Sequence, residues 1–144
     1  MKPSKRHSER GSNLVETSLI LLTFLMMLIG VIDFGQVLYF HQSLVERARA
    51  AARYGGVCLP TCSTTNVQNV AVYNDANPSG SPVPILPGMT TSMVNVQNLN
   101  ANTADAQVVV TISNYPINFI SPYIAQQFNN RPVTVSMSAE GEVP

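Results

Sequence analysis

One long apolar run dominates the first third of the chain. Residues 14–32 read LVETSLILLTFLMMLIGVI, in which Glu16 is the single charged residue. These 19 residues come close to the number, about 20, that a helix needs to cross the hydrocarbon core of a bilayer. The main alternative is a removable secretory signal, whose apolar core would be about 7–15 residues long with an A-x-A cleavage site after it. The nearest such triplet, residues 48–50, lies well beyond the run. We therefore predict a retained transmembrane helix over about residues 14–36.

The helix is predicted to continue past the membrane. Residues 37–54 contain no proline, and their later part is rich in helix formers. One face of this stretch carries small or apolar side chains suited to close packing: Leu44, Ala48, Ala51 and Ala52. Gly55-Gly56 is a typical C-terminal stop. The pattern predicts one helix over about residues 13–54, half in lipid and half projecting outward.

Beyond residue 57 the pattern changes to that of strands. Apolar and polar residues alternate with a period of two at residues 94–97, 108–113 and 133–138, as in half-buried strands. The turn-rich residues 98–105 predict that the first two strands form a hairpin. A three-stranded sheet of this size buries little by itself. We therefore expect its apolar face to pack on the small-residue face of the long helix.

The remaining outer residues predict minor elements. Residues 65–73 suit a short helix, residues 78–88 a proline-rich loop, and residues 116–130 either a short helix or a loop returning to the membrane surface. The predicted fold class is α+β, a long N-terminal transmembrane helix followed by a small antiparallel β-rich extracytoplasmic part. We divide the chain into a basic leader (1–11), the long helix (12–56) and the β-rich domain (57–144).

The distribution of charge orients the helix. The 144 residues have a formal net charge of zero and only 11% charged residues, against about 25% in soluble domains. Residues 1–11 carry four basic residues and one acid, and residues 12–144 carry four basic residues and seven acids. Basic residues flanking a span favour the cytoplasmic side. We predict a single-pass protein with a cytoplasmic N-terminus and an extracytoplasmic C-terminal part. The neutral balance argues against a nucleic-acid partner.

The side chains needed for catalysis are missing from the outer region. No histidine follows His41, which excludes Ser-His-Asp and Cys-His arrangements there. A paired-carboxylate site among its four acids would have to form by folding, and no glycine-rich phosphate loop or zinc-ligand pattern occurs. We therefore predict no enzyme, no cofactor or metal, and no small-molecule substrate.

Cys58 and Cys62, in the string CLPTC, are the only cysteines. On the outer side of a membrane they would meet an oxidising environment. A redox pair normally has the spacing C-x-x-C with a helix behind it. We favour a structural disulfide that closes a tight loop.

Two acids interrupt the apolar helix. Glu16 and Asp33 are 17 residues, or about 25 Å, apart along a helix, so that one can lie near each membrane boundary. We prefer this interfacial position for Asp33 over pairing inside the membrane. For Glu16 there are two interpretations. It fits a capping box with Asn13 as N-cap, and it also stands five residues after Gly11, behind a basic leader.

That second arrangement resembles a type IV prepilin signal. A short basic leader, the sequence Gly11-Ser12-Asn13-Leu14-Val15-Glu16 and an apolar helix follow in order. In that superfamily a membrane peptidase cuts after the glycine, and the glutamate at mature position five helps to order subunits during assembly. The resemblance implies cleavage between Gly11 and Ser12, and an assembly role for Glu16.

Residues 32–56 resemble the TadE-like family more specifically. The shared features are an acid-Phe-Gly triplet, here Asp33-Phe34-Gly35, and an Ala/Arg-rich helix that ends near Ala52-Arg53-Tyr54. TadE-like proteins are pilin-like components of tight-adherence (Flp) type IV pilus systems.

The resemblance implies a minor pilin or pseudopilin in the bacterial inner membrane. Its partners would be the prepilin peptidase and other pilin-like subunits, with lateral contacts near Glu16 and Gly30. Two alternatives come from other classes of protein. One is a membrane-anchored binding or adhesion module outside any pilus, and the other is a secreted enzyme with a retained signal. Missing catalytic side chains disfavour the second.

Overall fold

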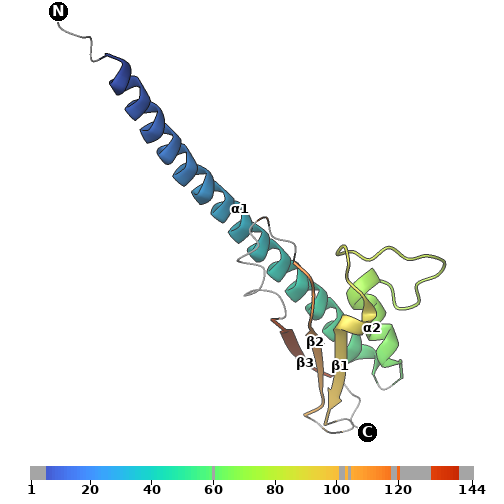
Figure 1. Ribbon diagram of the computed structural model, residues 1–144. Coiled ribbons are helices and arrows are strands. Elements are labelled where there is room, and N and C mark those ends of the chain that lie inside the picture. Colours follow the sequence, from blue (N-terminus) through green and yellow to red (C-terminus); the bar gives the residue numbers. More distant parts are fainter. Residues whose placement is uncertain are drawn as a thin grey trace, which may run out of the picture.

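The structure, a computed structural model, describes residues 6–59, 61–100, 103, 105–117, 120 and 131–139. Its largest element is α1 (Arg6–Cys58), a helix of 53 residues that is about 80 Å long at 1.5 Å per residue. The smaller elements are α2 (Thr64–Tyr73), the 3-10 helix η1 (Thr91–Met93), β1 (Val94–Leu99), β2 (Gln107–Ile112) and β3 (Val133–Ser138). They gather beside the C-terminal half of α1, while the N-terminal half extends away alone (Figure 1). The predicted α+β class is confirmed.

The start of α1 differs from the predicted one. We expected the helix to begin at about Asn13, and one of the two interpretations of Glu16 was a capping box with Asn13, but the helix begins at Arg6. Asn13 is an interior residue whose backbone carbonyl accepts a hydrogen bond of 2.8 Å from the Thr17 hydroxyl. The capping box is therefore wrong for the intact chain. Glycine costs a helix only about 1 kcal/mol relative to alanine, so Gly11 does not interrupt it.

The predicted stop at Gly55-Gly56 is also wrong, because α1 runs on to Cys58. A Cβ atom added to Gly55 would lie 3.0 Å from Cγ1 of Val108, and one added to Gly56 would lie 3.1 Å from the carbonyl oxygen of Ser138. Both distances are shorter than ordinary van der Waals contacts. The two glycines therefore let the sheet approach the helix backbone, and they do not terminate the helix.

Helix α2 follows α1 after a tight turn and confirms the predicted short helix. The Ser63 hydroxyl accepts from the backbone N–H of Thr65 at 3.1 Å, and the Asn66 side chain accepts from the backbone N–H of Ser63 at 3.3 Å. This reciprocal cap satisfies donors that the first helical turn leaves unpaired. At the other end Asn74 adopts φ of 60° and its N–H bonds to the carbonyl of Val70.

The three strands form one antiparallel sheet in the order β1-β2-β3. Val94 pairs with Ile112 in the β1–β2 hairpin, and Ile112 pairs with Val133 of β3. All three predicted strands and the predicted hairpin are confirmed, although β1 extends to Leu99. Most of the predicted 116–130 segment lies outside the described residues.

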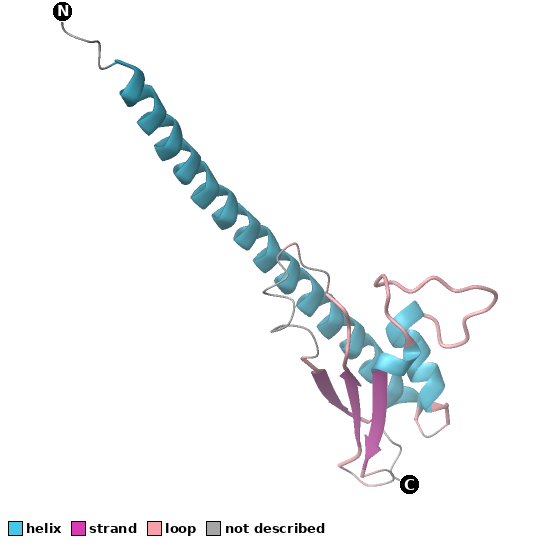
Figure 2. Ribbon diagram, in the orientation of Figure 1, coloured by secondary structure: helices cyan, strands magenta, loops and turns pink. Residues whose placement is uncertain are grey.

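The core lies between the sheet, α2 and the C-terminal half of α1. Its most buried side chains come from all of these elements: Ala48, Ala51, Ala52, Val67, Ala71, Val72, Val108, Val110 and Ile112. Figure 2 shows the sheet and α2 lying against the same half of α1. The expected packing of the sheet on the small-residue face of the helix is confirmed.

Candidate functional site

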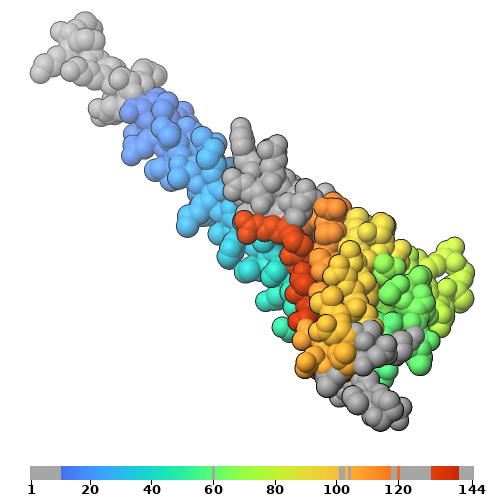
Figure 3. Space-filling view, turned by 90° about the horizontal axis from the view of Figure 1, so that it is seen from below, coloured from blue at the N-terminus to red at the C-terminus, as the bar shows by residue number. Residues whose placement is uncertain are grey.

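The N-terminal half of α1 is bare in the isolated chain. Every side chain from residue 11 to residue 32 is exposed except Ile29, which is half-buried. The exposed set is mostly large and apolar, and it includes Leu21, Phe24, Met26 and Val31. Figure 3 shows this half projecting from the rest of the molecule. Among the described residues, α1 is the one helix long and apolar enough to cross a membrane.

The same half offers a surface suited to another helix. Side chains one turn apart frame a shallow apolar groove lined by Leu19, Ile20, Thr23, Phe24 and Met27. A Cβ added to Gly30 or Gly35 would meet no atom within 4 Å. Packing within the described part of the chain therefore gives no reason for these two glycines, which lower helix stability by about 0.5–1 kcal/mol each.

The predicted processing and assembly residues lie at the start of this bare half. Gly11, Ser12 and Glu16 are all exposed. A Cβ on Gly11 would also meet open space. Within the described residues, the Glu16 side chain makes no hydrogen bond or ion pair. Asn13, three residues before it, lies inside the helix and is not an N-cap. Glu16 lies about one turn from Gly11 and Ser12 on the same helix, and it is 17 residues, about 25 Å, from Asp33.

Asp33 has an environment that the sequence did not predict. Its side chain is fully buried, with 0% exposed. Its Oδ1 accepts a hydrogen bond of 3.0 Å from the backbone N–H of Ile120, which lies 87 residues further along the chain. Phe34 and Gly35, the other members of the triplet, are exposed. Asp33 is therefore covered by the outer part of its own chain.

A covered stripe on α1 links Asp33 to the core. Asp33, Gln36, Phe40 and Leu44 are buried or half-buried, while Phe34, Leu38 and Tyr39 between them are exposed. This spacing of three or four residues is one face of a helix. Asp33 stands three turns before Leu44 on that face, which is the sequence signal that could have predicted its burial.

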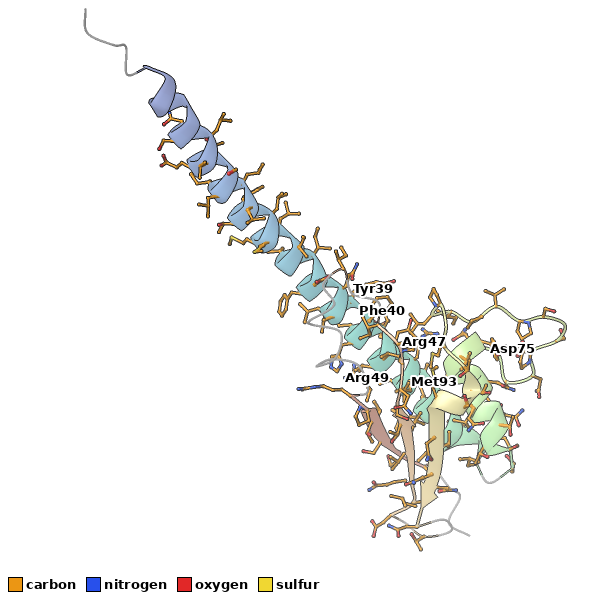
Figure 4. The ribbon with its side chains drawn as sticks, viewed as in Figure 1. Tyr39, Phe40, Arg47, Arg49, Asp75 and Met93 are labelled. Atoms are coloured by element: carbon orange, nitrogen blue, oxygen red, sulfur yellow. A yellow bond between two sulfur atoms is a disulfide. The ribbon has the colours of Figure 1, made fainter. Side chains whose placement is uncertain are left out.

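Tyr115 covers the middle of the stripe. Its ring packs on that of Phe40 with centroids 5.7 Å apart, and its hydroxyl donates to the carbonyl of Pro87 at 2.9 Å. Burial, followed by the neighbouring Tyr39 hydroxyl, raises the pKa of Tyr115. Figure 4 labels Tyr39 and Phe40 where the outer part meets the bare half of α1.

Cys58 and Cys62 are joined by a disulfide, with Cα atoms 5.5 Å apart. The bond closes the turn between α1 and α2. The backbone N–H of Cys62 also donates to the carbonyl of Cys58 at 3.0 Å, and the Thr61 hydroxyl donates to the same carbonyl. The two cysteines therefore have a structural role, because their disulfide fixes the geometry of the α1–α2 turn.

The arrangement of these residues supports roles in contacts within the chain and with other molecules. Within the described part of the chain, no three His, Cys, Asp or Glu side chains gather in a way that could hold a metal ion. Glu16 and Asp33, the acidic residues near the two ends of the bare half, have different environments. The Glu16 side chain is exposed, whereas the Asp33 side chain accepts a hydrogen bond from the outer part of the same chain.

Comparison with known proteins agrees with the resemblance noted in the sequence. Searches of curated proteins and of solved structures find no match. A family model does match, and its description is TadE-like protein. The matched residues, 11–53, begin at the predicted cleavage glycine and end where α1 is packed against the sheet. The resemblance to the TadE-like family is thereby confirmed for residues 11–53 of this chain.

Proposed function

We propose that this protein is a pilin-like subunit, of the minor pilin or pseudopilin kind, that acts in assembly of a tight-adherence type IV pilus. One observation carries the proposal: the TadE-like match spans the bare half of α1, whose apolar side chains have no partner within the described chain. Lipid covers such a surface before assembly, and neighbouring helices cover it afterwards. In membranes, helices associate through close packing and through polar contacts between them.

The proposed location is the bacterial inner membrane, with residues 1–11 in the cytoplasm and residues 57–144 outside it. The basic leader favours this orientation by the positive-inside rule. The disulfide in the α1–α2 turn is compatible with an oxidising compartment on the outer side.

Prepilin peptidase is the proposed processing partner, cutting between Gly11 and Ser12. Because a Cβ at Gly11 meets nothing within 4 Å, Gly11→Ala should leave the structure of the chain itself unchanged. A loss of cleavage in that variant would then report the peptidase subsite, in which glycine leaves little room for a methyl group.

Glu16 is the proposed assembly residue. Cleavage gives Ser12 a new α-amine, which is cationic near neutral pH, and Glu16 lies about one turn deeper in the membrane. A carboxylate without a partner is costly there. Pairing with the Ser12 amine of a neighbouring subunit offsets that cost and sets the axial stagger between adjacent helices.

The test compares cleavage and co-purification of partner subunits for wild type, Glu16→Ala and Glu16→Gln. We expect both variants to insert in the membrane and to lose crosslinks to neighbouring subunits, the alanine variant most completely. Ser18→Ala is a matched control, because Ser18 is also exposed and its hydroxyl donates to the carbonyl of Val15 in its own helix. It should assemble like wild type.

Assembly of Glu16→Ala at the wild-type level would exclude the proposed role of Glu16. A wild-type chain that stays in the membrane, uncleaved and without pilin-like partners, would instead be a membrane-anchored adhesion or binding module.

A further inference from the structure

After β2 the chain runs back along α1 toward its bare half. Ile112 ends β2 within the core, Tyr115 stacks on Phe40, and Ile120 bonds to Asp33. Phe40 and Asp33 are seven residues apart, or about 10 Å along the helix. Residues 113–117 and 120 therefore bring the outer region closer to the N-terminal half of α1 by about two helical turns.

Because the returning chain covers Asp33, the apolar surface of α1 continues past this residue toward the C-terminus. Asp33 would end that surface if its carboxylate faced outward, but its side chain is fully buried. The exposed residues beside it are apolar, since Phe34, Leu38 and Tyr39 are 63%, 46% and 63% exposed. The apolar surface thus runs from Leu14 to Tyr39, about 39 Å, which exceeds the roughly 30 Å of hydrocarbon in a bilayer.

Ile120 lies at the level of Asp33, where about 30 Å of hydrocarbon counted from Leu14 would end, about 20 residues along the helix. It is 57% exposed and is fixed to the helix at Asp33 by its backbone N–H. Tyr39 stands nearby on the helix, and tyrosine is enriched at membrane interfaces because its ring is apolar and its hydroxyl polar.

We propose that Ile120 docks the outer part on the lipid surface, inserted at the boundary between headgroups and acyl chains and held there by Asp33. The partner is the outer leaflet of the membrane that α1 spans. Asp33 is a positioning residue: its buried carboxylate accepts from the Ile120 backbone and does not face lipid. This inference rests on the proposed span of α1, and it does not require the pilus role.

The test measures the depth of three side chains in the full chain, reconstituted in phosphatidylethanolamine–phosphatidylglycerol vesicles. A fluorescent non-canonical amino acid replaces Leu25, Ile120 or Leu99, all of which are exposed and apolar. Quenching by brominated lipids reports contact with acyl chains, and quenching by iodide reports contact with water. We expect Leu25 to respond to lipid bromines alone and Leu99, at the far end of β1, to iodide alone. Ile120 should respond to bromines within about 5–10 Å of the headgroup boundary.

Two results would overturn the proposal in different ways. If position 25 responds to bromines but position 120 responds only to iodide, the span stands and the lipid contact of Ile120 does not. If position 25 itself responds to iodide, the proposed span fails, and the lipid contact fails with it.

The positioning role of Asp33 is tested with the label kept at position 120. Asp33→Leu removes the acceptor, and we expect the label to shift from bromine quenching to iodide quenching while position 25 stays deep. Asp33→Asn keeps a carbonyl acceptor and should retain the wild-type depth. Gln36→Leu is the matched control, because Gln36 lies on the same covered face one turn away. An unchanged depth at position 120 in Asp33→Leu would overturn the role of Asp33.

Discussion

The two halves of α1 are equally helical but differ in the size of the side chains they carry. Residues 11–32 carry Leu, Ile, Phe and Met, nearly all exposed, whereas the buried residues of the stretch 44–56 are Ala or Gly apart from Leu44. Ala48 and Ala51 are both 0% exposed, while Met27 is 72% exposed. Small side chains thus make the core of the single chain, because they let strands and α2 approach the helix backbone.

The comparison also shows where the unsatisfied apolar surface lies. Leaving one large apolar side chain in water instead of burying it costs about 1.5–3 kcal/mol. The exposed residues of the N-terminal half make this cost large, and the chain supplies no second layer to cover them within its described part. The packing of the C-terminal half of α1 is provided by one molecule, whereas the apolar side chains of the N-terminal half need a lipid or protein environment.

The largest expected effect comes from shortening one core side chain. Ile112 is a core residue and only 1% exposed, so Ile112→Ala should lower the free energy of unfolding of the outer part by about 2–5 kcal/mol. Leu22→Ala is the matched change in the bare half, where Leu22 is 53% exposed. It should leave that stability unchanged. Urea denaturation of the full chain in detergent, followed by limited proteolysis of the outer part, measures both.

Equal effects of the two substitutions would show that the halves of α1 are not independent. In that case the bare half would contribute to the stability of the outer part through contacts absent from this structure.

Removing the disulfide should have the next largest effect. It joins the end of α1 to α2 across a loop of only four residues in sequence separation. Short loops constrain the unfolded chain least, so the double substitution Cys58→Ser and Cys62→Ser should cost about 2 kcal/mol, at the low end of the usual range. Mass spectrometry of a non-reduced digest should show the two cysteines linked to each other. Quantitative thiol labelling of both residues in freshly isolated membranes would contradict this pairing.

Two glycine substitutions sharpen the comparison at smaller magnitude. At Gly55 the added methyl group would meet Val108 and Val67 at 3.0 and 3.4 Å. Overpacking of this kind costs about 1–3 kcal/mol, while the higher helix propensity of alanine stabilises the helix by up to about 1 kcal/mol. Gly55→Ala should therefore destabilise the outer part by about 1 kcal/mol. At Gly30 the methyl group meets open space. Gly30→Ala should therefore leave the outer part intact but weaken lateral association if neighbouring helices pack there.

Thermal unfolding measures the first effect and crosslinking the second. Loss of stability in Gly30→Ala, or none in Gly55→Ala, would contradict the assignment of the two glycines to different partners.

Local patterns predicted the elements whose burial repeats along the chain. The alternation of Val108, Val110 and Ile112 predicted both β2 and the face that it buries, because in a strand every second side chain points to one face. The small-residue face of α1 was predicted in the same way, since Leu44, Ala48 and Ala51 share one side of a helix. For these residues the sequence pattern and the tertiary packing agree.

The features that the pattern missed depend on contacts far apart in the chain. The glycine pair at 55–56 has the local signature of a helix stop, but its packing against Val108 and Ser138 decides its role. The predicted position of Asp33 at the membrane boundary stays a prediction, but no local signal names Ile120, 87 residues away, as the partner of its carboxylate. Propensity is a weak constraint where tertiary contacts are this close. The roles of Gly11, Ser12 and Glu16 depend on partners outside the chain and stay predictions.

The smallest expected effect concerns Tyr115, at the junction of the two halves. Tyr115→Phe removes the hydrogen bond to the Pro87 carbonyl and should cost about 0.5–1.5 kcal/mol at neutral pH.

Burial and then the Tyr39 hydroxyl raise the pKa of Tyr115 in the folded chain. A raised pKa means that the folded state favours the neutral phenol, so this contribution is complete below the unfolded pKa of about 10 and is lost as pH rises through the folded value. The stability difference between wild type and Tyr115→Phe should therefore shrink above about pH 10. Denaturation of both proteins across that range tests this, with Tyr39→Phe as the control that removes only the smaller cause. A difference that stays constant up to about pH 11 would mean that the Tyr115 phenol ionises as readily in the folded chain as in the unfolded one.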